Sequence, residues 1–486
     1  MILLTGATGY VGGRLLDRLC AMGVPVRCLC RNPGALRGQR PGLEVVRGDL
    51  TDESSIAPAF HGVRVAFYLV HSMGEGSGFE EIELACARNF ARRARESGVQ
   101  RIIYLGGLAQ GADLSPHMKS RVETGEALRS AGVPVLEFRA SVIIGSGSAS
   151  FEMIRALVEK LPVMITPRWV ASEAQPVAIE DVIEYLTQAV DAPVDGSQVI
   201  EIGGRDVTSY LGIMREFARQ RGLRRAFIQA PVLSLSLSSR WLTLITPLYA
   251  RIGRRLIESV RNPSVVRNPL PANLFRVRPM GLSEAICRAL NNEGRQKPIS
   301  RWSDATGASL SSEPFAATPP TGSLLSNVQV ARVPLPPEDA FAPVRRIGGQ
   351  QGWYFGNFLW RLRGLVDAMI GGVGMRRGRP DPEVPEPGTN LDFWRVEEYV
   401  PDVRLRLRAE MKVPGHAWLE FEATPRNGET ELRQAALFLP AGWLGHAYWR
   451  LLWPVHEAMF RGMLRRIAAS AVRLARQKDS IAPKGA

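Results

Sequence analysis

The chain has 486 residues, of which 45% are hydrophobic and 22% are charged, and this length predicts two or three globular domains. Its formal net charge is +14. The five cysteines include no C-x-x-C pair, which argues against a disulfide framework or zinc site and for a reducing compartment. No secretory signal or membrane span is apparent, so we expect a cytoplasmic protein.

The first twelve residues, MILLTGATGYVG, join a short apolar strand to a glycine turn and a helix start. Gly6 permits the tight turn, Gly9 lets backbone N–H groups approach a pyrophosphate, and Gly12 lets helix and strand pack closely. The spacing is G-x-x-G-x-x-G, and its strand-turn-helix context favours a dinucleotide site over an unoccupied turn. The predicted cofactor-binding residues of this turn are Gly6, Ala7, Thr8, Gly9, Tyr10, Val11 and Gly12.

Strands and helices then alternate as far as residue 138. This regular alternation predicts an α/β fold with a doubly wound parallel sheet. Ligands of such sheets bind beyond the carboxyl ends of the strands, which places the glycine turn, Arg31, Asp49 and His71 around one crevice. The predicted strands after the first cover 24–30, 43–46, 65–70, 101–105 and 133–138, and the predicted helices include 79–97 and 119–131.

Several motifs together resemble the extended or atypical short-chain dehydrogenase/reductase superfamily, on its NmrA-like side. They are TGATGYVG, RNP, GDLTD, YLVHSM, LRSAGVPVLEFRAS, VAIEDVIEYL and EIGGRDVTSYLGIM. The resemblance covers residues 1–290 and implies a Rossmann domain with a small substrate lobe, built from segments near 145–175 and 205–280. It also implies an NAD(P)-dependent oxidoreductase with a small hydrophobic, carbonyl or quinone-like substrate.

The catalytic positions depart from the pattern of that superfamily, whose active members carry a serine at the end of the fifth strand and a Tyr-x-x-x-Lys pair at the next helix. Gly106-Gly107 stands here in place of the serine. The Tyr-x-x-x-Lys pair corresponds to His117 and Arg121 in one register, or to Ser115 and Lys119 if the helix is aligned two residues earlier. His117 could act as an acid or base near neutral pH, and its alternative interpretation is a surface histidine. The missing tyrosine and serine leave a second hypothesis open, namely a non-catalytic NADP(H)-binding sensor or interaction protein.

Charge indicates which nicotinamide cofactor is preferred. An acidic residue about 20 positions past the glycines would hydrogen-bond the ribose 2′-hydroxyl of NAD, but Arg31 stands there and favours the 2′-phosphate of NADP. NAD remains the alternative if Arg31 is only a solvated charge. Asp49 and Leu50 resemble the pair that meets the adenine, or they form an Asp-capped turn. Val70 and His71, at the end of the next strand, complete the cofactor-binding candidates.

The last third reads as a separate domain. Ser-, Thr-, Pro- and Gly-rich sequence predicts a linker over 291–335, although 327–333 could form an edge strand of the C-terminal domain. Residues 336–480 predict an α+β domain, with an antiparallel meander closed by a long amphipathic helix. This pattern resembles the helix-grip fold of START-like proteins, and the fusion resembles a domain of unknown function appended to bacterial short-chain dehydrogenase homologues. The predicted strands are 391–400, 403–413, 416–423 and 430–438, and the helix spans 444–474.

Three further expectations concern ligands and partners. Seven of the ten tryptophans lie in the last third, which suits either a hydrophobic ligand or an aromatic core. The histidines show no metal-ligand spacing, so no metal is predicted. Residues 211–280 hold thirteen arginines against Glu216 and Glu258 (13 − 2 = +11). Solvated faces with contacts to acidic positions and cofactor phosphates are favoured there, then peripheral contact with the anionic inner membrane, and nucleic acid last.

Overall fold

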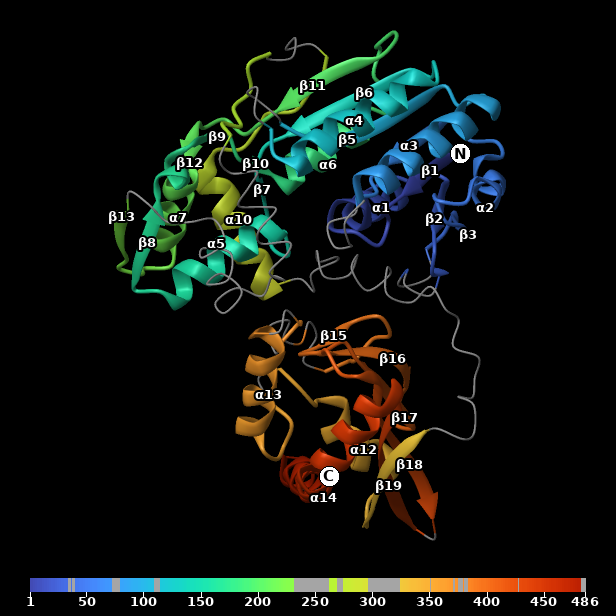
Figure 1. The fold of residues 1–486 in the computed structure, drawn as a ribbon, viewed down its shortest axis with the longest axis vertical. Coiled ribbons are helices and arrows are strands. Elements are labelled where there is room, and N and C mark those ends of the chain that lie inside the picture. The colour runs from blue at the N-terminus through green and yellow to red at the C-terminus, as the bar shows by residue number, and fades with distance from the viewer. Residues whose placement is uncertain are drawn as a thin grey trace, which may run out of the picture. The chain divides into compact units, whose positions relative to one another are not determined.

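The computed structural model describes residues 1–33, 36, 40–71, 79–108, 114–230, 262–268, 274–295, 324–349, 351–369, 372–374, 379, 383–426 and 428–481. The chain forms two compact units, Met1–Ser312 and Glu313–Ala486 (Figure 1). Within the described ranges, no helix is long and apolar enough to cross a membrane. The same residues contain no group of three His, Cys, Asp or Glu side chains that could hold a metal ion.

The N-terminal unit is built on a parallel sheet of seven strands in the order β11-β6-β5-β4-β1-β2-β3. Strands β1 and β4 consist wholly of buried residues, as expected for a parallel sheet that is covered on both faces. The predicted doubly wound sheet is confirmed. The strands are β1 (Ile2–Thr5), β2 (Val26–Cys30), β3 (Leu43–Arg47), β4 (Val65–Tyr68), β5 (Arg101–Gly107), β6 (Val135–Ala140) and β11 (Gln198–Ile202).

Helices cover both faces of this sheet (Figure 1). Leucines of α1 and α6 enter the core on one face, and α2, α3 and α4 bury apolar side chains on the other. Helices α3 and α4 pack side by side. The bounds are α1 (Tyr10–Ala21), α2 (Glu53–Ile56), η2 (Ala57–Phe60), α3 (Phe79–Glu96), α4 (Pro116–Ser130) and α6 (Ile179–Gln188).

A second apolar core, around Phe151, Phe217 and Ile286, forms a lobe beside the sheet (Figure 1). It draws on both segments from which the substrate lobe is predicted. Residues 231–261 and 269–273 of the arginine-rich window lie outside the described residues. The lobe contains β7 (Ile143–Ile144), α5 (Ala149–Lys160), β8 (Val163–Pro167), η3 (Arg168–Ala171), β9 (Glu173–Ala174), β10 (Val177–Ala178), β12 (Thr208–Ser209), α7 (Tyr210–Gln220), β13 (Ala226–Ala230) and α10 (Leu282–Arg295).

The C-terminal unit is an antiparallel sheet of six strands with a 40-residue helix, α14, that packs against β14 and β19. The expected α+β architecture is confirmed. Strand β14 lies within the range predicted as linker and forms the edge strand that the sequence left open. The elements are β14 (Leu325–Val333), α12 (Pro337–Arg345), α13 (Asn357–Met369), β15 (Asn390–Leu391), β16 (Trp394–Val400), β17 (Arg404–Ala409), β18 (Gly415–Arg426), β19 (Glu429–Pro440) and α14 (Gly442–Ile481).

Most described tryptophans of this unit belong to its core. Trp353 is fully buried, its ring centroid lies 5.3 Å from that of Trp360, and its Nε1 donates a hydrogen bond of 2.8 Å to Asp392. Burial raises the pKa of the Asp392 carboxyl, and the bond from Trp353 offsets part of that effect. Trp443 and Trp453 differ, since 76% and 39% of their surfaces are exposed.

Candidate functional site

The turn between β1 and α1 has the backbone geometry that its glycines predict. Gly6 has a φ of +73°, which only glycine adopts freely, and a Cβ atom there would overlap the Leu69 carbonyl. A Cβ on Gly12 would overlap the carbonyl oxygen of Gly6. A Cβ on Gly9 would lie 3.1 Å from that oxygen, and in the described part of the chain it would otherwise meet only its neighbours along the chain and its own helix within 4 Å. The turn itself therefore requires Gly6 and Gly12, whereas Gly9 leaves space beside the helix start.

Helix α1 begins at this turn with its N-terminus available to an anion. Gly9 is the N-cap residue and, as a glycine, brings no side chain to cap the helix, and its N–H donates to the Gly6 carbonyl at 2.9 Å. The first helical turn contains no acidic residue. Backbone N–H groups and the positive end of the helix dipole stabilise phosphate at such a position. The residues present thus fit the pyrophosphate of a dinucleotide.

The sheet places this turn at its topological switch point. Strand β1 pairs with β2 on one side and β4 on the other, so the crossovers diverge above the carboxyl end of β1. Thr5 joins β1 to β4, because its hydroxyl donates to the Phe67 carbonyl at 2.9 Å and accepts from the Leu69 N–H at 3.2 Å. This strand end is where the sequence predicts the cofactor crevice.

The side chains of Tyr10 and Val11 pack against the core of the sheet. The Arg14 guanidinium lies 4.8 Å from the centroid of the Tyr10 ring and donates to the Ser146 carbonyl at 2.9 Å. Burial raises the pKa of the Tyr10 hydroxyl. Ala7 is buried, whereas Thr8, Tyr10 and Val11 are half-buried.

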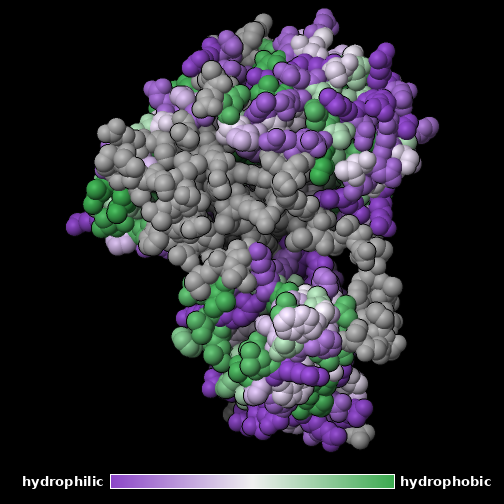
Figure 2. Space-filling view, in the orientation of Figure 1, coloured by the Kyte–Doolittle hydropathy of each residue, from purple (hydrophilic) through white to green (hydrophobic). Residues whose placement is uncertain are grey.

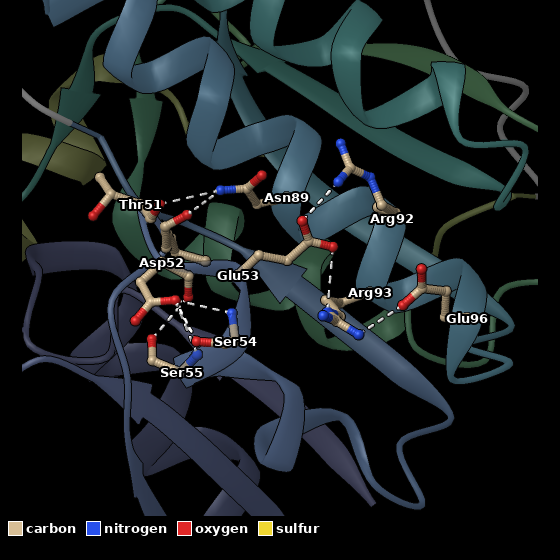
Figure 3. Close-up of polar contacts among 10 residues, drawn as sticks. Thr51, Asp52, Glu53, Ser54, Ser55, Asn89, Arg92, Arg93 and Glu96 are labelled. Atoms are coloured by element: carbon tan, nitrogen blue, oxygen red, sulfur yellow. Dashed lines mark hydrogen bonds and ion pairs between the residues drawn. The ribbon is translucent and has the colours of Figure 1, made fainter.

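The residues after β2 and β3 lie at the same edge of the sheet. Arg31 is exposed immediately after β2. Asp49 Oδ1 accepts from the Thr51 N–H at 2.9 Å and the Thr51 hydroxyl at 2.8 Å, so the Asp-capped turn is present. The Leu50 carbonyl accepts from Asn89 of α3 at 2.9 Å, and Figure 3 shows Asn89 reaching this turn. This turn is thus tied to α3.

Helix α2 is also held to α3, directly after that turn. Asp52 caps α2, and Figure 3 shows its carboxylate accepting from the Ser54 and Ser55 N–H groups. Glu53 forms ion pairs of 2.6 Å with Arg92 and 3.3 Å with Arg93. The polar contacts of Figure 3 therefore anchor the segment that carries Asp49 and Leu50.

A polar cluster lies past the end of β4, where three elements meet. His71 Nδ1 is 2.8 Å from Oε1 of Glu83 on α3, and Glu83 Oε2 accepts a hydrogen bond of 2.5 Å from the Ser120 hydroxyl on α4. The ring centroids of His71 and His117 are 4.7 Å apart. Glu83, His117 and Ser120 are all buried. The structure thus brings two predicted residues, His71 and His117, into contact, while Val70 is half-buried beside them.

The end of β5 and the start of α4 lie against each other. Arg121 donates to the Leu105 carbonyl at 2.8 Å, and a Cβ on Gly107 would lie 2.9 Å from Met118 Cε. Ser115 is the N-cap of α4, and the Lys119 side chain is 70% exposed. His117 is buried, which disagrees with its interpretation as a surface histidine.

Glu83 and Ser120 are the residues of this cluster that the sequence did not single out. A signal for Glu83 existed, because it precedes the buried Cys86, Ala87 and Phe90 by three, four and seven residues. An acid on the buried stripe of a helix needs a partner. For Ser120 we find no comparable signal in the sequence.

Comparison with known proteins identifies both halves of the chain. Residues 1–238 match the NmrA-like family, and residues 321–463 match a protein family of unknown function, DUF2867. A (4-alkanoyl-5-oxo-2,5-dihydrofuran-3-yl)methyl phosphate reductase of Streptomyces griseus is 32% identical over 36% of this chain and 61% of that protein. The ceramide reductase of Caulobacter vibrioides is 27% identical over 48% of this chain and 74% of that protein.

The chain thus spans about three fifths of the length of the Streptomyces griseus reductase. It spans 30% of the 3β-hydroxysteroid dehydrogenase/isomerase of Mycobacterium tuberculosis, at 32% identity over 21% of this chain. Among solved structures, the triphenylmethane reductase of Citrobacter sp. has a TM-score of 0.49 and 19% identity over 60% of this chain and 99% of that one. The N-terminal unit of this protein belongs to the NmrA-like, NAD(P)-binding short-chain dehydrogenase/reductase type, and a DUF2867 domain follows it.

Proposed function

We propose that the protein binds NADP(H) at the turn from Gly6 to Gly12 and reduces a small hydrophobic carbonyl or quinone-like substrate. The observation that carries this proposal is the glycine turn, which begins a helix with glycine as its N-cap at the switch point of the sheet. The next strand end carries the half-buried His71, which contacts the buried His117. The pyrophosphate would rest on backbone N–H groups of the turn. Arg31 would meet the 2′-phosphate, and NAD is the alternative if it does not.

Other residues around the crevice would hold the rest of the nucleotide. Asp49 and Leu50 would lie beside the adenine, at the turn that α3 fixes in place. Val70 and His71 follow β4 and would line the nicotinamide half. A reduced nicotinamide supplies a hydride when bound.

Reduction of a carbonyl also requires a proton at the developing oxygen. We assign this proton to His117, which stands for the family tyrosine in the first of the two sequence registers. His71 lies against His117, and Glu83 holds His71 through Nδ1. In this arrangement Glu83 and Ser120 are positioning residues, because they act through His71 and not on the substrate. Arg121 already donates to the Leu105 carbonyl through Nη1, so it could assist only through its other N–H groups.

That last contact favours the second candidate function, a non-catalytic NADP(H)-binding sensor or interaction protein. The Arg121 guanidinium is engaged by a strand-end carbonyl, and Gly106-Gly107 replaces the serine hydroxyl. In either case the C-terminal unit, whose long helix lies along an antiparallel sheet as in START-like proteins, would bind a hydrophobic ligand.

One experiment separates the two candidates. NADPH fluorescence is titrated with the full chain, and NADPH oxidation is then followed with a panel of aldehydes, ketones and quinones. An enzyme binds NADPH and oxidises it with a member of the panel, whereas a sensor binds it without oxidation. The variant Gly9→Val should abolish binding, because a side chain there enters the space beside the helix start. Absence of NADPH and NADH binding by the unaltered protein would contradict both candidates.

A further inference from the structure

Helix α13 of the C-terminal unit exposes an apolar face. Phe358, Leu362 and Leu365 are 73%, 45% and 47% exposed, and their spacing of four and three residues places them on one side of the helix. Leu359 and Val366 flank this stripe and are also exposed. Soluble proteins rarely leave a continuous apolar helix face in water unless it binds something.

The rotation of α13 is fixed by the opposite side of the helix. Trp360 is buried there, with its ring centroid 6.4 Å from that of Phe460 of α14. Asp367 is fully buried and accepts hydrogen bonds from the N–H groups of Gly374 at 2.8 Å and Lys412 at 2.7 Å. The apolar stripe therefore cannot turn inward without breaking these contacts.

The first turns of α14 repeat the arrangement. Leu444, Leu451 and Val455 are 56%, 80% and 44% exposed and recur at seven and four residues, which is one side of a helix. Trp443, at the helix start, is 76% exposed. On the buried side, the ring of Trp449 stacks on Phe438 of β19 with centroids 5.5 Å apart. This part of α14 is thus apolar on both sides, although only one side packs against its own sheet.

The exposed charges beside these two stripes have one sign. In the described residues of 357–367 and 442–457, the exposed charged side chains are Arg361 and Arg450. The acid Asp367 is buried, and the half-buried Glu457 is paired with Arg461 and accepts from Asn327. Figure 2 shows the hydrophobic surface of α13 on the C-terminal unit, next to hydrophilic side chains. An exposed apolar face with tryptophan and arginine, whose neighbouring carboxylates are buried or already paired, is complementary to an anionic lipid surface.

We infer that the two exposed stripes, Phe358/Leu362/Leu365 of α13 and Leu444/Leu451/Val455 of α14, attach the protein to the surface of an anionic membrane. The apolar side chains enter the boundary between headgroups and acyl chains, and Arg361 and Arg450 meet lipid phosphates. A second copy of this chain is the less suitable occupant, because a symmetric dimer through the same stripes would bring arginines together without acids to pair them.

The test measures flotation of the full chain with vesicles of phosphatidylcholine alone or with 30% phosphatidylglycerol as the probe. We expect binding to the mixed vesicles that weakens with salt. Leu451→Glu and Leu362→Glu should each lower partitioning about tenfold, because each removes a leucine from the contact. The matched control is Val330→Glu, which places the same charge on a valine of β14 that is 55% exposed.

The emission of Trp443 gives an independent readout. Mixed vesicles should shift the tryptophan emission to shorter wavelength, and Trp443→Phe should remove most of that shift while circular dichroism stays unchanged. The inference is overturned if mixed vesicles do not bind the protein, or if Val330→Glu weakens binding as much as Leu451→Glu. Three results together would assign the stripes to a second copy of the chain. The unaltered protein would have twice the monomer mass by light scattering, Leu451→Glu would have the monomer mass, and the unaltered protein would not bind vesicles. The vesicle experiments do not measure NADPH binding. If they contradict membrane attachment, the proposed function is unaffected.

Discussion

His71 and Glu83 form a hydrogen-bonded pair in which the histidine is half-buried and the glutamate buried, with Nδ1 of the histidine 2.8 Å from Oε1 of the glutamate. They come from the end of β4 and from α3, twelve residues apart in the chain. Ser120 of α4 occupies the other carboxylate oxygen. The two carboxylate oxygens of Glu83 thus contact His71 and Ser120, one each. The contact at Nδ1 holds the His71 ring against His117, which lies in the first turn of α4.

The Glu83→Gln variant tests whether this pair positions His71. The amide keeps one acceptor oxygen but loses the charge and the second acceptor, so we expect the free energy of unfolding to fall by about 1–2 kcal/mol. NADPH binding should persist, and carbonyl reduction should fall about tenfold with an altered pH–rate profile, measured by steady-state kinetics. Glu81→Gln, on the exposed side of the same helix, is the matched control. Equal rates and pH profiles for the two variants would show that Glu83 has no positioning role.

The His117→Ala variant tests the proton donor. We expect NADPH to bind with unchanged affinity, measured by fluorescence titration, while carbonyl reduction falls at least about a hundredfold, because general acid catalysis is removed. His61→Ala changes an exposed histidine of the same unit and should leave both quantities unchanged. If His117→Ala reduces carbonyls at the normal rate, another group donates the proton.

The glycines of the first turn should differ in what they support. Gly12→Ala places a methyl group against the Gly6 carbonyl, so it should lower the free energy of unfolding by about 2 kcal/mol or more in urea denaturation. Gly9→Ala meets the same oxygen at 3.1 Å and should cost much less. Equal destabilisation by the two variants would contradict the close helix–strand approach at Gly12.

The Arg31→Ala variant tests the cofactor preference. If Arg31 binds the 2′-phosphate, its loss should weaken NADPH about tenfold or more, since a charge-assisted hydrogen bond contributes about 1.5–3 kcal/mol. The Kd for NADH, measured by the same fluorescence titration, should stay constant. Arg18→Ala, in the last turn of α1, provides the control. Equal weakening of NADPH and NADH by Arg31→Ala would contradict the preference for NADP.

The sequence predicted those features that depend on local backbone chemistry. The apolar runs identified the strands, and the glycine spacing identified a turn in which Gly6 does adopt a positive φ. Helix α4 begins at Pro116, three residues before the predicted start at 119, because Ser115 caps it. Serine followed by proline is a start signal that could have been read.

The arrangement of side chains from different elements could not be predicted in the same way. Periodicity over 79–97 places Ile82 on the apolar side of α3, yet Ile82 is 50% exposed and Glu83 faces the interior. The partner that makes this burial tolerable, His71, belongs to another element, and only the tertiary fold brings the two together. Likewise, the sequence left 327–333 open between linker and edge strand, and the register with β19 decides for the strand.

His456 should make the C-terminal unit sensitive to acid. Burial, together with the nearby positive charge of Arg363, lowers the pKa of His456 from 6.5 to about 4. Between these values the unfolded chain binds a proton that the folded chain does not, so stability falls as the pH decreases from about 6.5 towards 4 and is unaffected above that range. At pH 5 the free energy of unfolding should be lower by about 2 kcal/mol than at neutral pH.

Urea unfolding followed by tryptophan emission should show this loss of stability, since seven of the ten tryptophans are in the last third of the chain. His456→Leu should flatten the pH dependence, whereas the exposed His416→Leu should not. If both variants retain the slope of the unaltered protein, another group causes the acid sensitivity.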